Sequence, residues 1–584
     1  MEDQARPIYI ETGFGPAFGW WHAPAAPATD LTIVMCPPIG SELMCSYYPM
    51  RQLALALARA GIAVVRVDYH GTGDSAGYDD DPDRVAAWLA TIDRAIDWAK
   101  ARGGRVGVLG LRLGATLAAV CASQRDDVAC AVLWAPCKTG TAFTREMRML
   151  AQTDVAMATD PAKTPVPSLN GGAVEAGGFL LTPSTIAELA KLDLGKLGRP
   201  VAPRALVIGR DDVGGGDKIA SALGAEYAGW PGYAKMMLAP HHAKPATGAY
   251  EQIAAWLTDG AALRGDAAIE LRAEPSIDPS IDLPAGVRER PLRFGPDRRL
   301  VGIISEPAAA ASRRGRAVVL ANTGANYHVG PNRMYVRMAR DWAARGYTVL
   351  RFDLGGIGES APRPGLPSNV PYQTEGALDL ELAVIEARRL ASARDVVAVG
   401  LCSGAYYSFH AGLRGTQLDA QILVNPQTFY WHDGDGLDAA PAVVAERVQA
   451  YKARARSWAS WKKLLTGNAN YRALARTVWN RARDIGETRL KRAGARLGLY
   501  TIAEDLDRDI RAISERGIAT LMVYSEHDAG IVYLEQRVPG GLATVARTGG
   551  FTVETIRDAD HTFSNQAAQQ RLIALMTSYL TSRA

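Results

Sequence analysis

A cysteine between two glycines is the residue of this chain best suited to covalent chemistry. In Gly400-Leu401-Cys402-Ser403-Gly404 it follows the apolar run DVVAV and precedes small residues typical of a helix start. A strand that turns sharply into a helix exposes the residue at the tip of the turn, and glycine on both sides leaves room for it. The pattern therefore predicts a nucleophile elbow with Cys402 at its tip, where a thiolate can attack an acyl carbonyl.

An acid and a histidine follow in the order that such an elbow requires. The strand-like segment ATLMVYS is followed by Asp528, and FTVETI is followed by His561. We expect His561 to take the thiol proton and Asp528 to fix the imidazole tautomer, with Glu526 and His527 as neighbours able to replace Asp528. A free thiol titrates near pH ~8.5, so an imidazolium and a helix N-terminus are needed to keep a thiolate at neutral pH.

Backbone amides are expected to bind the oxyanion. The candidates are the N–H of Ser403 and one N–H from Gly324-Ala325, in the loop after an earlier strand. An alternative makes Cys402 an inert packed thiol and Ser403 the hydroxyl nucleophile. The elbow register favours Cys402, because Ser403 points off the tip. His328, near the same loop, is interpreted as a surface histidine.

The elements that must position these residues are written twice. The paired segments are VVRVDYHGTGDSAG (64–77) with VLRFDLGGIGESAP (349–362), and VGVLGLRLGA (106–115) with VVAVGLCSGA (396–405). The offset is 285 residues in the first pair and 290 in the second. A nearly constant offset predicts two copies of one fold.

Each copy alternates short β-branched runs with amphipathic helical stretches, which is typical of an α/β domain with a mostly parallel sheet flanked by helices. We predict one domain over residues 1–263, a Pro-rich linker over 264–290 and a second domain over 291–584. Each domain has an insert before its acid strand, at about 138–200 and about 432–517. We expect these inserts to be helical lids over the active sites.

The first copy carries an arginine at its elbow, in the sequence GLRLG. A guanidinium stays protonated and cannot attack a carbonyl, so this domain is expected to be inactive. Asp211 or Asp212, and His241 or His242, stand where the other triad members belong. One interpretation pairs Arg112 with one of these aspartates, and the other makes Arg112 an anion site for a phosphate or carboxylate. The first is favoured.

These motifs resemble the α/β-hydrolase superfamily, in two tandem copies covering nearly the whole chain. The first copy, with CPPIGSELM and GLRLGA, resembles hydrolases encoded beside exosortase and exopolysaccharide genes. The second, with ANTGANYHVGPNRMYVRMAR, GLCSGAY and VNPQTFYW, is similar to serine-aminopeptidase-like hydrolases. Such gene clusters often include acyl carrier proteins and acyl-activating ligases, so the resemblance implies acyl transfer without naming a substrate.

Charge is unevenly distributed along the chain. The net charge of +4 over 584 residues is too small to indicate a nucleic-acid binder. From Arg447 to Arg496, however, fourteen Lys and Arg face two acidic residues, a local +12 that leaves −8 for the rest. This segment is a solvated helical face, a dock for an acidic acyl carrier protein, or a surface for anionic lipid. We favour the anionic protein partner.

Several classes are disfavoured by the sequence. No apolar run reaches the roughly 18–20 residues that cross a bilayer, and the start lacks a secretory pattern, so we expect a cytoplasmic protein. Six scattered cysteines with no C-x-x-C pair predict neither disulfides nor a metal site. Gly71-Thr72-Gly73 begins a dinucleotide-like pattern, but YDDDP intervenes before any helix, so no cofactor is expected.

Together these patterns predict acyl transfer through an acyl-Cys402 intermediate formed from a thioester or ester. The acceptor of the acyl group stays open: water, an external alcohol or amine, or the substrate's own nucleophile. Thioesterases that use cysteine for intramolecular release offer an analogy for the last of these. One alternative is a carboxylester or lactone hydrolase like the dienelactone hydrolases, which also place cysteine at the elbow. The other is a non-catalytic scaffold in which both elbows have decayed.

Overall fold

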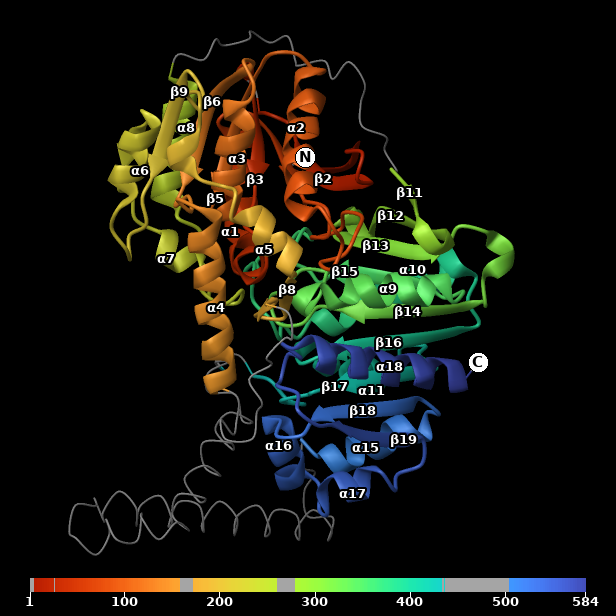
Figure 1. Cartoon of the computed structure of the whole chain (residues 1–584). Helices are drawn as coiled ribbons and strands as arrows, with labels where there is room; N and C mark the ends of the chain where they lie inside the picture. The colour runs from red at the N-terminus through yellow and green to blue at the C-terminus, as the bar shows by residue number, and fades with distance from the viewer. Residues whose placement is uncertain are drawn as a thin grey trace, which may run out of the picture.

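Two β-sheets with the same strand order form the framework of the protein, seen in the computed structural model of Figure 1. The structure describes residues 5–25, 27–157, 172–259, 279–432, 435 and 504–583. The first sheet runs β1 (Arg6–Glu11), β2 (Pro16–His22), β4 (Ala63–Val67), β3 (Leu31–Cys36), β5 (Arg105–Leu111), β6 (Val128–Trp134), β9 (Arg204–Ile208), β10 (Glu226–Ala228). The second runs β11 (Ile281–Leu283), β12 (Val287–Phe294), β13 (Leu300–Pro307), β15 (Thr348–Asp353), β14 (Arg316–Ala321), β16 (Asp395–Leu401), β17 (Ala420–Val424), β18 (Ala519–Ser525), β19 (Phe551–Ile556). Apart from the extra edge strand β11, the two orders correspond strand for strand, so the repeated sequence segments build a repeated sheet.

Each sheet is parallel except at one edge. In the first, β1 pairs with β2 and β2 with β4 in antiparallel register, and the strands from β4 to β10 are parallel. The second sheet repeats this pattern, with β12, β13 and β15 in antiparallel register and parallel strands from β15 to β19. Helices cover both faces of the central strands, so runs such as Leu31–Cys36 are buried throughout. The predicted α/β class with two mostly parallel sheets is confirmed.

Helices pack on both faces of each sheet. In the first domain, α2 (Arg84–Lys100) and α3 (Leu113–Ser123) bury apolar residues on one face, and α1 (Ser41–Arg59) and α8 (Thr247–Thr258) on the other. In the second, α10 (Gly376–Ala391) and α11 (Ser403–Arg414) lie opposite α9 (Met334–Ala344) and α18 (Gln566–Ser582). Helix α2 shows why: Trp88, Ile92 and Ile96 recur every four residues and are fully buried.

The long helix α4 and several shorter elements complete the described chain. The first domain adds α4 (Gly140–Met157), β7 (Val174–Ala176), β8 (Phe179–Leu181), α5 (Pro183–Leu189), η1 (Leu194–Lys196), α6 (Gly216–Leu223) and α7 (Tyr233–Met236). The second adds η2 (Pro284–Gly286), η3 (Pro296–Arg298), η4 (Ala310–Ser312), η5 (Pro331–Arg333), α15 (Leu506–Glu515), α16 (Ala529–Arg537) and α17 (Gly541–Val545).

Two predicted boundaries differ from the structure. Strand β11 lies inside the segment 264–290 that we predicted as linker, because Ile281 and Leu283 alternate inward on the edge of the second sheet. The second insert was predicted to end at 517. Leu506, Ile510 and Ile513 of α15 nevertheless pack into the core on the same face of the sheet as α10 and α11, so α15 belongs to the domain core. The basic segment 447–496 lies outside the described residues.

The two domains share buried apolar contacts. Phe18 and Trp20 of β2 pack with Val301 and Ile303 of β13, the corresponding strand of the other sheet. A second cluster joins α1 to the segment that leads into α9, where the rings of Tyr47 and Tyr327 stack with centroids 3.6 Å apart. The two halves are thus packed against each other through corresponding elements.

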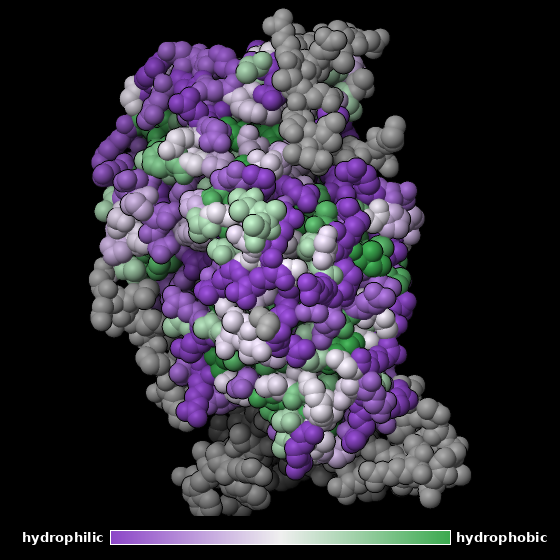
Figure 2. Space-filling model, turned by 90° about the vertical axis from the view of Figure 1, so that its right-hand side faces the viewer, coloured by the Kyte–Doolittle hydropathy of each residue, from purple (hydrophilic) through white to green (hydrophobic). Residues whose placement is uncertain are grey.

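On the side of the molecule that Figure 2 shows, apolar residues are scattered in small groups among hydrophilic ones. Within the part of the chain that the structure describes, no helix combines the length and apolarity needed to cross a membrane.

Candidate active site

The turn from β16 into α11 has the strained geometry of an elbow. Cys402 sits at its tip with φ 57° and ψ −114°, a region that residues with a side chain rarely adopt. A Cβ at Gly400 would lie 2.0 Å from the carbonyl carbon of Gly404, and a Cβ at Gly404 would lie 2.9 Å from the oxygen of Ala321. Both flanking glycines are therefore required, and the thiol is held out from the end of the sheet.

The Cys402 thiol differs electrostatically from the other five cysteines of the chain. Burial raises its pKa, but the charge of the nearby His561 and a hydrogen bond from Tyr372 outweigh burial, so its pKa falls below the ordinary value. Burial raises the pKa of every other thiol, and the list is Cys36, Cys45, Cys121, Cys130 and Cys137. Cys402 is also partly accessible. A partly accessible thiol with a lowered pKa is the kind that reacts.

The structure brings His561 and Asp528 together beside this thiol. Nδ1 of His561 lies 2.6 Å from Oδ2 of Asp528, which is 5% exposed. Burial lowers the pKa of His561, but Asp528 and Cys402 outweigh it and raise the pKa well above the ordinary value. Nε2 of His561 is buried and makes no aligned hydrogen bond within the described residues. The alternatives Glu526 and His527 are exposed and contribute no such contact in the described structure.

Asn425, which the sequence analysis did not predict, binds the backbone of His561. Its Nδ2 donates to the carbonyl oxygen of His561 at 2.7 Å, and its Oδ1 accepts from the N–H of Ser525 at 2.7 Å. The residue is fully buried with φ 45° at the end of β17. It therefore ties the histidine loop to the sheet at the strand that precedes Asp528.

Ser403 has a supporting position. Its side chain is fully buried, and its Oγ accepts the N–H of Gly324 at 2.8 Å. The Gly324 amide is therefore engaged, which differs from our expectation that either loop amide is free. Ala325 N–H makes no hydrogen bond within the described structure, and Ser403 N–H is one of the unbonded amides that begin every helix. These two N–H groups remain as the candidate oxyanion donors.

Tyr372 touches the thiol and escaped the sequence analysis. Its hydroxyl lies 3.4 Å from Sγ of Cys402, and its ring stacks on Trp431 with centroids 4.5 Å apart. The residue is 2% exposed and has φ 63°, a strained conformation for a tyrosine. It comes from the loop before α10, where no motif marks it.

The elbow of the first domain keeps the same backbone but holds a paired arginine. Arg112 has φ 55° and ψ −125°, close to the angles of Cys402. Its guanidinium is 3% exposed and binds Glu42 at 2.8 Å and also Glu146. The predicted pairing with Asp211 or Asp212 is therefore wrong, because the guanidinium pairs with glutamates on α1 and α4 instead. Two carboxylates occupy the guanidinium, which leaves no place for the alternative anion site.

The two aspartates predicted for this elbow bind groups other than Arg112. Asp211 accepts the N–H groups of Gly232 and Ala234, which begin α7, and Asp212 pairs with Arg210. The rings of His241 and His242 lie against each other, 4.1 Å between centroids, in a turn that is at least partly exposed.

The prediction that His328 is a surface histidine is wrong. It is 1% exposed, and its two ring nitrogens lie 2.8 Å from Asp353 and 2.6 Å from Asp74. Asp74 belongs to the other domain, 254 residues away in the chain, so local sequence gives no sign of this contact.

The repeated sheet, the elbow and the placement of an acid and a histidine after late strands define an α/β-hydrolase. The family model described as serine aminopeptidase, S33 matches residues 45–159 and 313–561, more than half of the chain, and the chain belongs to this family. The resemblance to exosortase-associated hydrolases remains a prediction. No curated protein matches the chain.

Solved structures also match in part. Est1E from Butyrivibrio proteoclasticus is 14% identical, with 44% of this chain and 98% of that chain covered at a TM-score of 0.31. The Pyrobaculum calidifontis esterase is 18% identical, with 44% and 85% covered at 0.30. The Pyrococcus furiosus esterase is 16% identical, with 44% and 93% covered at 0.28.

Proposed function

We propose that the protein transfers acyl groups through a covalent acyl-Cys402 intermediate, taking them from an ester or thioester. The observation that carries this proposal is the contrast among the thiols. Cys402 alone of the six cysteines has a lowered pKa, and it stands at a strained elbow beside a His561–Asp528 pair. Serine is the nucleophile implied by the family name, and the neighbouring Ser403 hydroxyl is buried and engaged with the oxyanion loop.

The first half of the reaction forms the intermediate. The Cys402 proton passes to Nε2 of His561, and the thiolate adds to the acyl carbonyl carbon. The N–H groups of Ser403 and Ala325 bind the resulting oxyanion, while Asp528 stabilises the imidazolium. Collapse breaks the bond to the leaving alcohol or thiol, which takes the proton from His561.

The second half passes the acyl group on. An acceptor O–H or N–H gives its proton to His561 and attacks the thioester, and the Cys402 thiolate leaves. Because a thioacyl enzyme remains a reactive donor, water, an alcohol, an amine and the substrate's own nucleophile all satisfy this step. An acidic acyl carrier protein as donor stays a prediction, since it depends on the basic segment 447–496.

Activity measurements test the proposal. Release of alcohol or thiol from aryl esters and acyl thioesters is compared between the wild-type chain and C402A, H561A and S403A. We expect loss of at least about a thousandfold in C402A and H561A, and a smaller loss in S403A, which removes only a support of the loop. Full activity in C402A, or complete loss in S403A alone, contradicts the assignment of the nucleophile.

A further inference from the structure

The domain interface carries two reciprocal ion pairs built from the same turn of each copy. Asp74 and Glu359 hold corresponding places in the repeated segments, and each reaches across to the other domain. Oδ1 of Asp74 accepts a hydrogen bond from Nη1 of Arg351 at 2.6 Å, and Oε1 of Glu359 accepts one from Nη2 of Arg66 at 2.7 Å. All four side chains are buried. Two matched contacts of equal kind thus hold the domains together.

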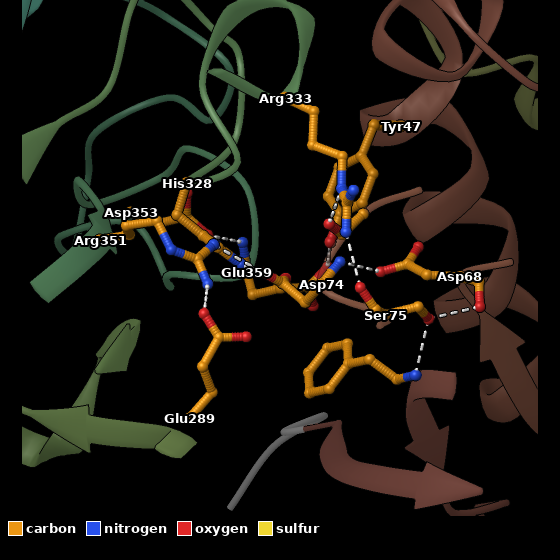
Figure 3. A network of polar contacts seen from close by, with 12 residues as sticks. Tyr47, Asp68, Asp74, Ser75, Glu289, His328, Arg333, Arg351, Asp353 and Glu359 are labelled. Atoms are coloured by element: carbon orange, nitrogen blue, oxygen red, sulfur yellow. Dashed lines mark hydrogen bonds and ion pairs between the residues drawn. The ribbon is translucent and has the colours of Figure 1, made fainter. Parts of the chain in front are cut away.

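The two contacts differ in what else they bind. The carboxylate of Glu359 is shared by Tyr47, Arg51 and Arg66, all from the first domain. The carboxylate of Asp74 also accepts Nε2 of His328, at 2.6 Å, as seen between the two domains in Figure 3. Asp74 therefore binds the segment that follows β14 directly, at His328, whereas Glu359 reaches it only through Tyr47, whose ring stacks on Tyr327.

That segment contains the proposed oxyanion loop. Nδ1 of His328 lies 2.8 Å from Oδ2 of Asp353, whose Oδ1 accepts Nδ2 of Asn322 at 3.0 Å. The same Nδ2 reaches the carbonyl oxygen of Asn326 at 2.9 Å. Asp353 therefore holds both ends of residues 322–328, and Ala325 lies between them.

The charges of this buried cluster balance only when His328 is protonated. The acids are Asp74, Asp353 and Glu289, and the bases are Arg351, Arg340 and His328, all at most 5% exposed. Burial lowers the pKa of His328, but Asp74 and Asp353 outweigh burial and raise it to about 10. His328 is thus an imidazolium that donates one hydrogen bond to Asp353 and one to Asp74. Both carboxylates stabilise its charge.

We propose that Asp74, on the first domain, is a positioning residue for the active site of the second domain. Through His328 and Asp353 it fixes residues 322–328, so that the N–H of Ala325 faces the carbonyl oxygen of a substrate at Cys402. The first domain, with Arg112 in place of a nucleophile, is then part of the catalytic unit. This inference rests on the proposed function.

Two reactions of the same sulfur separate positioning from folding. Alkylation of Cys402 by iodoacetamide needs the thiolate but no oxyanion donor, whereas acylation by an ester needs both. In the full chain, we expect D74N to slow acylation about 10–100-fold and to leave the alkylation rate and KM within about twofold. The matched control E359Q, at the corresponding place, is expected to keep both rates within about threefold.

Each other outcome counts against the inference. Unchanged acylation in D74N, or an equal loss of acylation in D74N and E359Q, shows that Asp74 does not act on the loop. If D74N does not fold, D74E takes its place with the same two readouts, because its longer side chain displaces His328 while keeping the charge.

A third readout is independent of the proposed function. Hydrogen exchange of a peptide covering residues 322–330 is measured in the wild-type chain, D74N and E359Q. We expect at least tenfold faster exchange in D74N alone. If the wild-type chain forms no acyl adduct, the proposed function fails, and equal exchange in the three proteins then overturns the positioning role as well.

Discussion

At the scale of single residues, the proposed reactivity of Cys402 depends on three neighbours. His561 supplies charge, Asp528 holds the imidazole, and Tyr372 donates a hydrogen bond to Cys402. The tyrosine keeps its proton because burial and the nearby thiol raise its pKa well above the ordinary value. It is therefore a neutral donor that favours the thiolate over the thiol.

Removing that donor is expected to raise the thiol pKa. A hydrogen bond to a charged group contributes about 1.5–3 kcal/mol, so Y372F is predicted to shift the pKa of Cys402 upward by about one unit. The measurement is the rate of iodoacetamide alkylation as a function of pH. Y406F is the matched control, because Tyr406 packs against Tyr372 at 5.3 Å between centroids without a hydrogen bond to Cys402 in the described structure. Identical profiles for Y372F and the wild-type protein refute the role of the hydroxyl.

The residues that sequence could identify are those marked by local pattern. Cys402, Asp528 and His561 each follow an apolar strand, in a fixed order, so their positions alone predict them as candidates. Tyr372 follows no strand, and Asn425 follows β17 but has no place in the order of nucleophile, acid and histidine. The importance of both comes from loop conformations with positive φ that place them against distant partners.

At the scale of elements, the elbow is set by the close approach of a strand and a helix. The helix α11 begins where β16 ends, and glycines at both sides of the tip allow the contact. In the first domain a Cβ at Gly114 would lie 2.2 Å from the oxygen of Pro37, so that elbow has remained equally tight around Arg112. The two elbows thus share one backbone geometry, although the residues at their tips differ.

A methyl group at Gly400 is predicted to disrupt this approach. Its Cβ would lie 2.0 Å from backbone of Gly404, so G400A must move β16 or α11 and is expected to cost about 1–3 kcal/mol of unfolding free energy. The control is G412A in α11, whose Cβ would meet its nearest atom at 3.5 Å and which is expected to be neutral or stabilising by up to about 1 kcal/mol. Urea denaturation measures both variants, and equal stabilities would contradict the steric account.

Several central strands could be predicted from their apolar runs, whereas edges and inserts could not. The run that became β4 is buried on both faces, so its pattern is unmistakable. Strand β11 has only three residues, and its flanking prolines and short polar residues look like linker. Its strand state comes from pairing with β12, a contact that composition does not encode.

At the scale of the whole molecule, the sequence predicts the duplication but not how the two domains pack against each other. A nearly constant offset revealed two copies, but the ion pairs of Asp74 and Glu359 connect residues 277 and 293 positions apart. The same separation explains why His328 seemed to be a surface residue. Its environment is created only when the first domain covers it.

The His328 contacts predict how stability depends on pH. The histidine faces Asp74 and Asp353, lies edge-on to Tyr327, and shares Asp74 with Arg351. Its pKa is raised from about 6.5 unfolded to about 10 folded, so its stabilisation is complete below pH ~6.5 and is lost as pH rises through about 10. The urea midpoint is expected to fall from pH 7.5 to 10.

A variant isolates this contribution from other alkaline titrations. H328Q leaves two buried carboxylates without their shared cation and is expected to lose about 3–5 kcal/mol at pH 7. Because the missing group no longer titrates, the gap between H328Q and the wild-type protein should narrow as pH rises towards 10. A gap that stays constant with pH would show that His328 is not charged in the folded protein.

The site of the covalent bond tests the central claim most directly. The full-length protein is incubated with aryl esters and acyl thioesters, quenched in acid, and the adduct is located by intact mass and peptide mapping. The account predicts one acyl group on Cys402, absent from C402A and retained in S403A. An adduct on Ser403, or one that survives in C402A, would contradict it.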